Sequence, residues 1–347
     1  HPNIDLRVIF QSNISVREYI DPGFGINVKW DIKLLHGYKY NFLNAIIRDK
    51  GKLSFFRPIV SGVLKYLKMD KWDAVWFHGY NHHSIIWALI LCKFLKIPFF
   101  IRMESNLNVS PKGNLLKDLF IKYIVKNASG LLYIGRDNKD YYYAYGANNS
   151  KLFSVPYAVD NKFFRNLSSR SINVNFEKFK LGIKKEYPII LYVGKFIKRK
   201  NPVLLLEAFA RLSNNGQPPN AYLLYIGDGQ EKQNLLNKIK ILGLNNNVKL
   251  LGFKNQTELG VFYKMCDVFV MPSSKEAYGL VINEVLNFLK PIITTTEVAA
   301  AKDLLEHNVN GFIYEPQDIK TLSQYLEKFL NQRNLTSEMG KKNIHKL

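Results

Sequence analysis

Cysteine and long apolar runs are both scarce in this chain of 347 residues. Cys92 and Cys266 are the only cysteines, and each lies inside an apolar run, which excludes a small disulfide-bonded scaffold and leads us to expect a reducing, cytoplasmic environment. The most apolar segment, residues 84–101, is interrupted by two lysines and by Pro98. We therefore predict a buried helix and a strand there instead of a membrane span.

Acidic residues are also few. The chain has 28 Asp and Glu against 49 Lys and Arg, which gives a net charge of +21. This excess indicates an anionic partner, for which nucleotide phosphates, nucleic acid and an acidic membrane surface are all candidates. The hydrophobic content of 47% predicts a globular protein, and the length predicts two domains.

Strand-like and helix-like segments alternate in both halves of the chain, a pattern typical of parallel sheets covered by helices. In the first half the expected strands are 5–10, 73–77, 98–102 and 131–134, and the expected helices are 42–48, 58–68, 84–96 and 115–127. In the second half the expected strands are 189–193, 221–226, 248–251, 268–271 and 291–294, and the expected helices are 202–212, 231–242, 256–266, 279–287 and 319–331.

A polar, charged stretch without sustained periodicity separates the two alternations. We predict an α/β protein with a Rossmann-like domain over residues 1–165, a linker over 166–186 and a second doubly wound domain over 187–332. Residues 333–347 are expected to form a C-terminal segment that returns to the first domain. Ligands of such sheets bind beyond the carboxyl ends of the strands.

The expected helix at residues 115–127 has two possible environments. Its apolar side chains recur at helical spacing with lysines between them, so it could lie on a membrane, although packing in the core with a solvated basic face is the more common arrangement. The apolar residues are Leu116, Leu119, Phe120, Tyr123 and Ile124, and the lysines are Lys117, Lys122 and Lys126.

The stretch from Val268 to Leu286 carries the most specific chemistry. It reads as a strand, a small polar loop with Glu276, and a helix with Glu284. Backbone N–H groups at the start of such a helix favour anions, and both carboxylates can accept hydrogen bonds from sugar hydroxyls. The alternative is that Glu276 is a solvated loop residue and Glu284 a surface charge.

Two further loops follow predicted strands of the second half. Residues 194–202 contain Lys195 and Lys200, which could neutralise a diphosphate, although a solvated charge run is an equal alternative. Gly227 and Gly229 flank an aspartate in a turn that could approach a nucleotide or could serve only as turn punctuation.

Taken together, these motifs resemble retaining glycosyltransferases of family 4, which have the GT-B architecture of two Rossmann-like domains facing a cleft. The resemblance covers nearly the whole chain. In the second half the matching segments are Val193-Gly194-Lys195 with Lys200, Ile226 to Gly229, Leu251-Gly252-Phe253, Pro272-Ser273 with Glu276 and Glu284, and Asn310-Gly311-Phe312. In the first half they are His78-Gly79-Tyr80, Arg102 to Ser105 and Pro156 to Asp160.

The resemblance implies a role for each matching residue. Glu284 would bind the ribose of a nucleotide-diphosphate-sugar, and Glu276 and His78 would contact the donor sugar. Lys195 and Lys200 would offset the charge of the leaving phosphate. The remaining donor-binding positions would be Gly194 and Gly227 near the nucleotide, Gly252 and Phe253 bordering the base, and the backbone amides of Ala277, Tyr278, Gly279 and Leu280.

No metal or cofactor is expected. The chain lacks the Asp-x-Asp signature of metal-dependent glycosyltransferases, and His78, His82 and His83 lack a Glu-x-x-His partner for zinc. The family implies retention by a same-face mechanism in which the leaving phosphate helps to deprotonate the acceptor.

The chain departs from the family at three places. The family usually has arginine at the position of Lys195 and glycine at that of Asn201. In addition, the strand at 5–10 resembles the family's second strand, so the first strand and its glycine-rich loop are expected to be missing here.

Three functions remain open. The first is transfer of a sugar to a polysaccharide or glycolipid acceptor at the inner face of a membrane, with the aromatic loop Tyr19–Tyr40 facing the acceptor. The second is a nucleotide-sugar epimerase of the same architecture. The third is a non-enzymatic basic protein that binds anionic membrane or nucleic acid, although nucleic acid is not expected because no reader motif is present.

Overall fold

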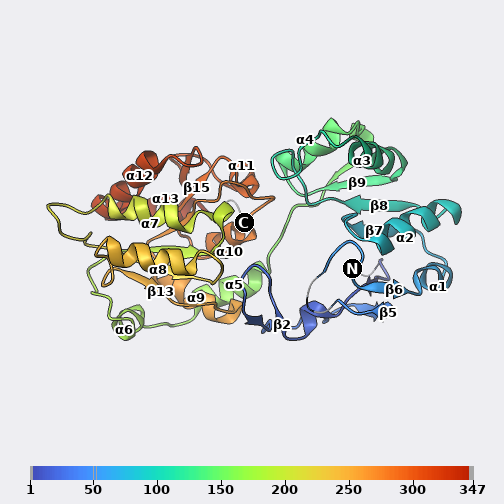
Figure 1. Ribbon diagram of the computed structural model, residues 1–347. Coiled ribbons are helices and arrows are strands. Elements are labelled where there is room, and N and C mark those ends of the chain that lie inside the picture. Colours follow the sequence, from blue (N-terminus) through green and yellow to red (C-terminus); the bar gives the residue numbers. More distant parts are fainter. Residues whose placement is uncertain (1–2, 50, 52, 344–347) are drawn as a thin grey trace. The chain divides into compact units, whose positions relative to one another are not determined.

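The computed structural model describes residues 3–49, 51 and 53–343, and Figure 1 traces its helices and strands. The chain divides into two compact units. Unit 1 comprises His1–Pro22 and Asn27–Pro156, and unit 2 comprises Gly23–Ile26 and Tyr157–Leu347. The boundary therefore lies before the expected position at residue 165, because the helix that begins at Asn161 packs within unit 2.

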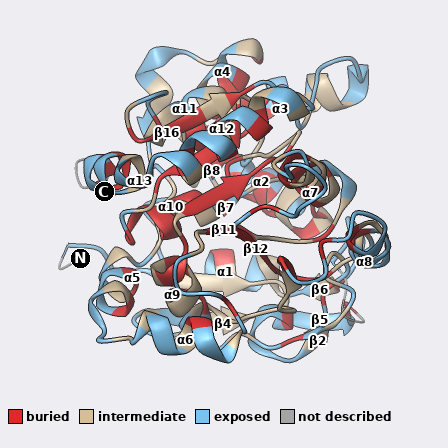
Figure 2. Cartoon of the chain, turned by 90° about the vertical axis from the view of Figure 1, so that its left-hand side faces the viewer, coloured by how far each residue is buried: buried red, intermediate tan, exposed pale blue. Residues whose placement is uncertain are grey.

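Unit 2 is built on one parallel sheet of six strands. Most of its strand residues are buried, as expected for a parallel sheet covered on both faces; Figure 2 colours the buried residues of the chain red. The strand order is β13-β12-β11-β14-β15-β16. The bounds are β11 (Ile189–Val193), β12 (Tyr222–Ile226), β13 (Val248–Leu250), β14 (Val268–Met271), β15 (Ile292–Thr295) and β16 (Gly311–Tyr314).

Helices connect these strands and share the core of unit 2. The core includes apolar side chains of α7 (Pro202–Ala210), α8 (Lys232–Ile241), α12 (Ile319–Asn331) and α13 (Arg333–Lys341). The remaining connections carry η3 (Lys198–Lys200), α9 (Gln256–Met265), α10 (Leu280–Leu286) and α11 (Ala299–Leu304).

The predicted linker at 166–186 is wrong as a structureless segment. It contains the end of α5 (Asn161–Ser169) and all of α6 (Val174–Lys180), and both helices pack against α9. Each helix starts at a side-chain cap, from Asp160 and Asn173. The helices are short and charged, so tertiary packing decides their conformation more than sequence periodicity does.

The C-terminal segment also belongs to unit 2. Met339 of α13 lies in its core, and Asn343 Nδ2 donates to the Lys290 carbonyl at 2.9 Å. The expected return of residues 333–347 to the first domain is therefore wrong for residues 333–343, and residues 344–347 lie outside the described part of the chain.

Unit 1 contains two separate parallel sheets. One has four strands in the order β10-β9-β8-β7, and the other pairs β1 (Arg7–Phe10) with β4 (Lys39–Phe42). The bounds in the larger sheet and its connections are β7 (Val75–His78), α2 (His83–Phe94), β8 (Phe99–Arg102), α3 (Leu115–Asn127), β9 (Gly130–Tyr133), α4 (Arg136–Ala144), η2 (Asn149–Lys151) and β10 (Leu152–Ser154).

Two helices expected early in unit 1 are wrong or shortened. Residues 44–47 form β5 (Asn44–Ile47), which pairs with β6 (Ile59–Ser61) in an antiparallel sheet, and only Val63–Lys68 of the second segment forms a helix, α1. The two isoleucines of β5 suit a strand, and pairing with β6 provides its hydrogen bonds. The other short elements are η1 (Ile14–Val16) and the antiparallel pair β2 (Tyr19–Ile20) and β3 (Asn27–Val28).

Helix α3 has the expected bounds but a different orientation. Leu116, Leu119 and Tyr123 are exposed, so the expected core packing of these three residues is wrong. The side chains that α3 buries are Ile121, Ile124 and Val125. Within the described residues, no helix combines the length and the apolar character needed to cross a bilayer.

The packing of α13 on unit 2 generates a first prediction. A Cβ at Gly340 would lie 1.9 Å from the carbonyl oxygen of Leu289, so Gly340→Ala must push α13 away from the backbone at Leu289. We expect a loss of about 1–3 kcal/mol in the free energy of unfolding, measured by urea denaturation. The control Lys341→Ala changes an exposed neighbour. Equal free energies of unfolding for Gly340→Ala and Lys341→Ala would contradict the close contact between α13 and Leu289.

Candidate functional site

The candidate site lies in unit 2, at the carboxyl ends of β11 and β14. The strand order reverses between these two neighbouring strands, because β12 and β13 extend the sheet on one side and β15 and β16 extend it on the other. Ligands of open α/β sheets bind at such a switch point. The loops that follow β11 and β14, residues 194–201 and 272–279, lie there.

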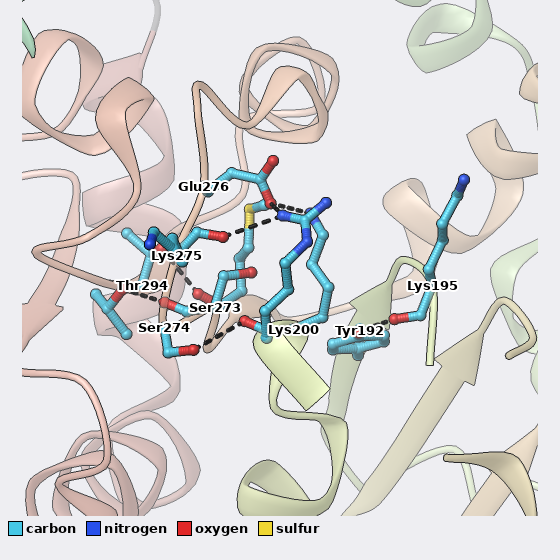
Figure 3. Close-up of polar contacts among 11 residues, drawn as sticks. Tyr192, Lys195, Lys200, Ser273, Ser274, Lys275, Glu276 and Thr294 are labelled. Atoms are coloured by element: carbon cyan, nitrogen blue, oxygen red, sulfur yellow. Dashed lines mark hydrogen bonds and ion pairs between the residues drawn. The ribbon is translucent and has the colours of Figure 1, made fainter. Parts of the chain in front are cut away.

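Glu276 is held by two cations from the loop after β11, as Figure 3 shows. Its Oε2 accepts a short hydrogen bond from Lys200 Nζ and another from Arg199 Nη1 at 3.3 Å. The same arginine nitrogen donates to the Lys275 carbonyl at 3.1 Å. The structure thus brings the two predicted site residues together and adds Arg199, which the sequence alone did not assign to the site.

The Glu276–Lys200 pair is largely removed from water. The two side chains expose 13% and 15% of their surface. Burial lowers the pKa of Lys200, and the nearby Glu276 carboxylate opposes this shift. With Arg199 the cluster carries two positive charges against one negative charge, so it can accept a further anion such as a phosphate.

Backbone contacts fix the two loops to each other. The Ser274 amide donates to the Arg199 carbonyl at 2.8 Å, and Asn201 Nδ2 donates to the Pro272 carbonyl at 3.0 Å. Asn201 has a φ of 49°, in the left-handed region that favours glycine and that asparagine tolerates best among other residues. This geometry explains how asparagine can stand at a position where the family resemblance leads us to expect glycine.

Glu284 is buried in α10 of the same unit. Tyr263 OH donates to its Oε2 at 2.7 Å. Burial raises the pKa of Glu284 from 4.5 to about 7, and the Tyr263 bond opposes the shift. The alternative interpretation of Glu284 as a solvated surface charge is therefore wrong. The Tyr263 hydroxyl already donates a hydrogen bond to one of the two carboxylate oxygens of Glu284.

Residues 277–280 form the end of the loop after β14 and the first residue of α10. Gly279 caps the helix with a φ of 109°, and a Cβ there would lie 2.9 Å from Val298 Cγ1. Tyr278 is buried, and its ring lies 4.9 Å from that of Tyr157. Ala277 is half-buried and Leu280 is 37% exposed. Donor contacts by the amides of these residues stay a prediction.

Backbone hydrogen bonds and close backbone contacts link the glycines that follow β11, β12 and β13. The Gly194 amide donates to the Ile226 carbonyl at 3.0 Å, and the Gly227 amide donates to the Gly252 carbonyl at 2.9 Å. A Cβ at Gly227 would lie 1.9 Å from Gly194 O. Close backbone approach alone therefore explains Gly227, and the predicted nucleotide contacts of these three glycines remain untested.

Lys195 points away from Glu276, although both were assigned to one donor site (Figure 3). Its Nζ lies 4.8 Å from the centre of the Phe24 ring, and that ring meets Phe253 edge to face at 5.0 Å. The segment Gly23–Ile26 groups with unit 2. Phe24, in the loop Tyr19–Tyr40 that is expected to face the acceptor, thus contacts Phe253, in the loop that is expected to border the base. No sequence pattern predicts this contact.

His78 lies in unit 1, at the end of β7. Its ring stacks on Trp76 at 5.0 Å, and desolvation first and Arg102 second lower its pKa, while Glu104 opposes the shift. His82 instead caps α2 by accepting from the Ser84 amide. Within the described ranges, no group of three or more His, Cys, Asp or Glu side chains could hold a metal ion. The predicted contact of His78 with the donor sugar remains a prediction.

Comparison with known proteins defines the class. Residues 173–346, half of the chain, match the family model described as glycosyl transferases group 1, and the chain therefore belongs to this family. It is 28% identical over 207 residues to the capsular polysaccharide biosynthesis glycosyltransferase CapM of Staphylococcus aureus, covering 60% of this chain and 50% of CapM. The first curated relatives are matched over about half of their length.

Other relatives extend over more of the chain. The identity to the UDP-Gal:alpha-D-GlcNAc-diphosphoundecaprenol alpha-1,3-galactosyltransferase of Escherichia coli is 23% over 303 residues, covering 85% of this chain and 75% of that enzyme. Among solved structures, Anabaena HepE in complex with UDP has a TM-score of 0.74 at 17% identity, covering 98% of this chain and 93% of HepE. These likenesses confirm the predicted GT-B fold.

The raised pKa of Glu284 predicts a pH-dependent stability. The folded state holds a proton that the unfolded chain releases, so this stabilisation is complete below about pH 4.5 and is lost as the pH rises through about 7. Glu284→Gln keeps an acceptor for Tyr263 without the ionisation. We expect its stability relative to the wild type to increase between pH 5 and 8, by on the order of 3 kcal/mol.

Urea denaturation at both pH values measures this difference. Glu327→Gln, which changes an exposed glutamate of α12, serves as the control and should follow the wild type. A Glu284→Gln variant with the same pH profile as the wild type would show that Glu284 ionises normally.

Proposed function

We propose that this protein is a retaining, metal-independent glycosyltransferase of family 4. It transfers a sugar from a nucleotide-diphosphate-sugar to a saccharide or lipid-linked acceptor. The observation that carries this proposal is the cluster of Glu276, Lys200 and Arg199 at the switch point of unit 2. This cluster combines cations for a diphosphate with a carboxylate for sugar hydroxyls.

The named relatives support the choice of substrates. Anabaena HepE was solved with UDP, with UDP and glucose, and with UDP-glucose. The names of the Escherichia coli relative and of a Campylobacter jejuni N-acetylgalactosaminyltransferase include undecaprenol-linked saccharides. A uridine diphosphate sugar and a lipid-linked saccharide are therefore the first donor and acceptor to test, at the cytoplasmic face of a membrane.

The proposed reaction proceeds on one face of the sugar. The bond between C1 and the diphosphate oxygen breaks, and a bond between C1 and the acceptor oxygen forms on the same face. The acceptor proton passes to the departing phosphate. Lys200 and Arg199 stabilise the charge that develops on the diphosphate, which is the largest electrostatic demand of such a transition state.

Glu276 and Glu284 divide the recognition of the donor. Glu276, fixed by Lys200 and Arg199, accepts hydrogen bonds from hydroxyls of the transferred sugar and orients its C1 atom. Glu284 accepts from the ribose hydroxyls, which would supplement its bond from Tyr263. His78 contacts the donor sugar, and Lys195 adds positive charge for the nucleotide.

Substitution of Glu276 tests the assignment. Glu276→Gln keeps the size of the side chain but weakens its acceptor, and Glu276→Ala removes it. We expect the rate of sugar transfer to fall by at least about 100-fold, the usual effect of losing a group that acts in the transition state. The release of nucleoside diphosphate with and without acceptor measures the rate.

Glu327→Gln on α12 is the matched control and should turn over normally. Near-normal turnover by Glu276→Ala would remove Glu276 from the mechanism. Formation of an isomeric nucleotide-sugar without acceptor would instead indicate an epimerase.

Metal independence has its own test. Since Lys200 and Arg199 supply positive charge at the diphosphate, we expect the rate of transfer to be unchanged after dialysis against EDTA. A loss of activity that Mg²⁺ or Mn²⁺ restores would contradict this part of the proposal and leave the role of Glu276 intact.

A further inference from the structure

The outer sides of α2 and α3 form an apolar and basic surface on unit 1, which we name the α2–α3 face. Its large apolar residues are Trp87, Ile90 and Phe94 of α2 and Leu115, Leu116, Leu119 and Tyr123 of α3, all of them exposed. Its lysines are Lys93, Lys122 and Lys126, which are also exposed. Surfaces that combine these two kinds of side chain are typical of interaction sites.

The two helices contribute to one continuous surface. Lys93 Nζ donates to Tyr123 OH at 3.1 Å and to Asn127 Oδ1 at 3.0 Å, so α2 and α3 lie side by side there. Ile90 and Phe94 flank Lys93 on α2. Leu116, Leu119 and Tyr123 follow one another at spacings of three and four residues along α3 and therefore share its outer side.

The core of unit 1 does not explain this surface. Ile121, Ile124 and Val125 already supply the buried side of α3. On the outer side, Leu116 and Phe94 remain 80% and 79% exposed. Both sides of α3 are thus apolar, and only one side packs against unit 1.

We propose that the α2–α3 face docks on the surface of an anionic lipid bilayer. Leucine and aromatic side chains can enter the boundary between headgroups and acyl chains, while the long lysine side chains reach the lipid phosphates. The two helices carry four lysines and a single acidic residue, Asp118. Asp118 is engaged by the Gly113 amide at 2.8 Å and by Tyr145 OH at 2.7 Å.

The charge pattern disfavours a second copy of this chain as the occupant. A twofold contact through the α2–α3 face would bring the lysines of both copies together without acidic partners, and like charges across an interface are unfavourable. An anionic bilayer instead matches both the apolar and the basic side chains. This inference goes beyond the proposed function, because binding to lipid needs neither donor nor acceptor.

Vesicle flotation tests the proposal with the full chain and no substrates. We expect the wild type to bind vesicles of phosphatidylglycerol and phosphatidylethanolamine, to bind phosphatidylcholine vesicles much more weakly, and to lose affinity as salt is raised. The double variant Leu116→Ser with Leu119→Ser should bind at least about tenfold more weakly. Lys122→Gln with Lys126→Gln should lower both the affinity and its dependence on salt.

Unit 2 provides matched controls. Ile241 of α8 is 81% exposed, so Ile241→Ser removes an equally exposed apolar residue. Lys240→Gln with Lys320→Gln removes two exposed lysines of unit 2. These controls should bind vesicles like the wild type, and thermal melting should show that every variant is folded, because all the changed residues are exposed.

Tryptophan fluorescence reports the contact directly. Addition of anionic vesicles should shift the emission of the wild type to shorter wavelength, and Trp87→Phe should lose this shift while Trp72→Phe keeps it. The proposal is overturned by failure of the wild type to bind anionic vesicles, or by unchanged binding of the Leu116/Leu119 variant. Sedimentation showing a dimer that this variant dissociates would identify a second copy as the occupant and would also overturn it.

Discussion

The site depends on the ion pair between Lys200 and Glu276. Both side chains are largely shielded from water, and charges so placed are tolerated only when they are matched closely. Removal of one partner would leave the other as a buried charge, at a cost of roughly 3–5 kcal/mol. The pair therefore constrains the loops that carry it as well as the chemistry that they can perform.

The sheet of unit 2 makes this pair possible. β11 and β14 are neighbours in this sheet although their last residues, Val193 and Met271, are far apart in the sequence.

 In the sequence β12 and β13 come between β11 and β14, but in the sheet they lie on the other side of β11. The loops at the carboxyl ends of β11 and β14 bring Lys200 and Glu276 to one place. The side-chain amide of Asn201 and the backbone amide of Ser274 bind these two loops together. The fold thus brings together groups that are distant in the sequence.

Much of this architecture could be predicted from the sequence, because its elements are long, apolar and bounded by glycine or proline. β11, β14, α3 and α12 have the expected bounds. The strand at 44–47 and the helices α5 and α6 could not be predicted, since tertiary pairing and packing stabilise these short segments. Periodicity also did not reveal which side of α3 faces the core, because both of its sides are apolar.

The candidate site was predictable only in part. Glu276 and Lys200 follow strands that are easy to recognise, and their motifs resemble a known family. The bonds from Arg199 to Glu276 and from Tyr263 to Glu284, like the contact between Phe24 and Phe253, depend on tertiary structure and leave no local pattern. Arg199 adds a positive charge to the site, and burial, opposed by the Tyr263 hydrogen bond, raises the pKa of Glu284. The sequence therefore indicated the position of the site better than its electrostatics.

The most direct test of the central claim is a calorimetric titration of UDP into the wild type and into Lys200→Gln, with Lys320→Gln as the control. If the cluster binds a diphosphate, Lys200→Gln should weaken UDP binding by about tenfold or more, as expected for the loss of a charge-assisted hydrogen bond, while uridine binding changes little. Equal UDP affinity in the wild type and Lys200→Gln would contradict the account.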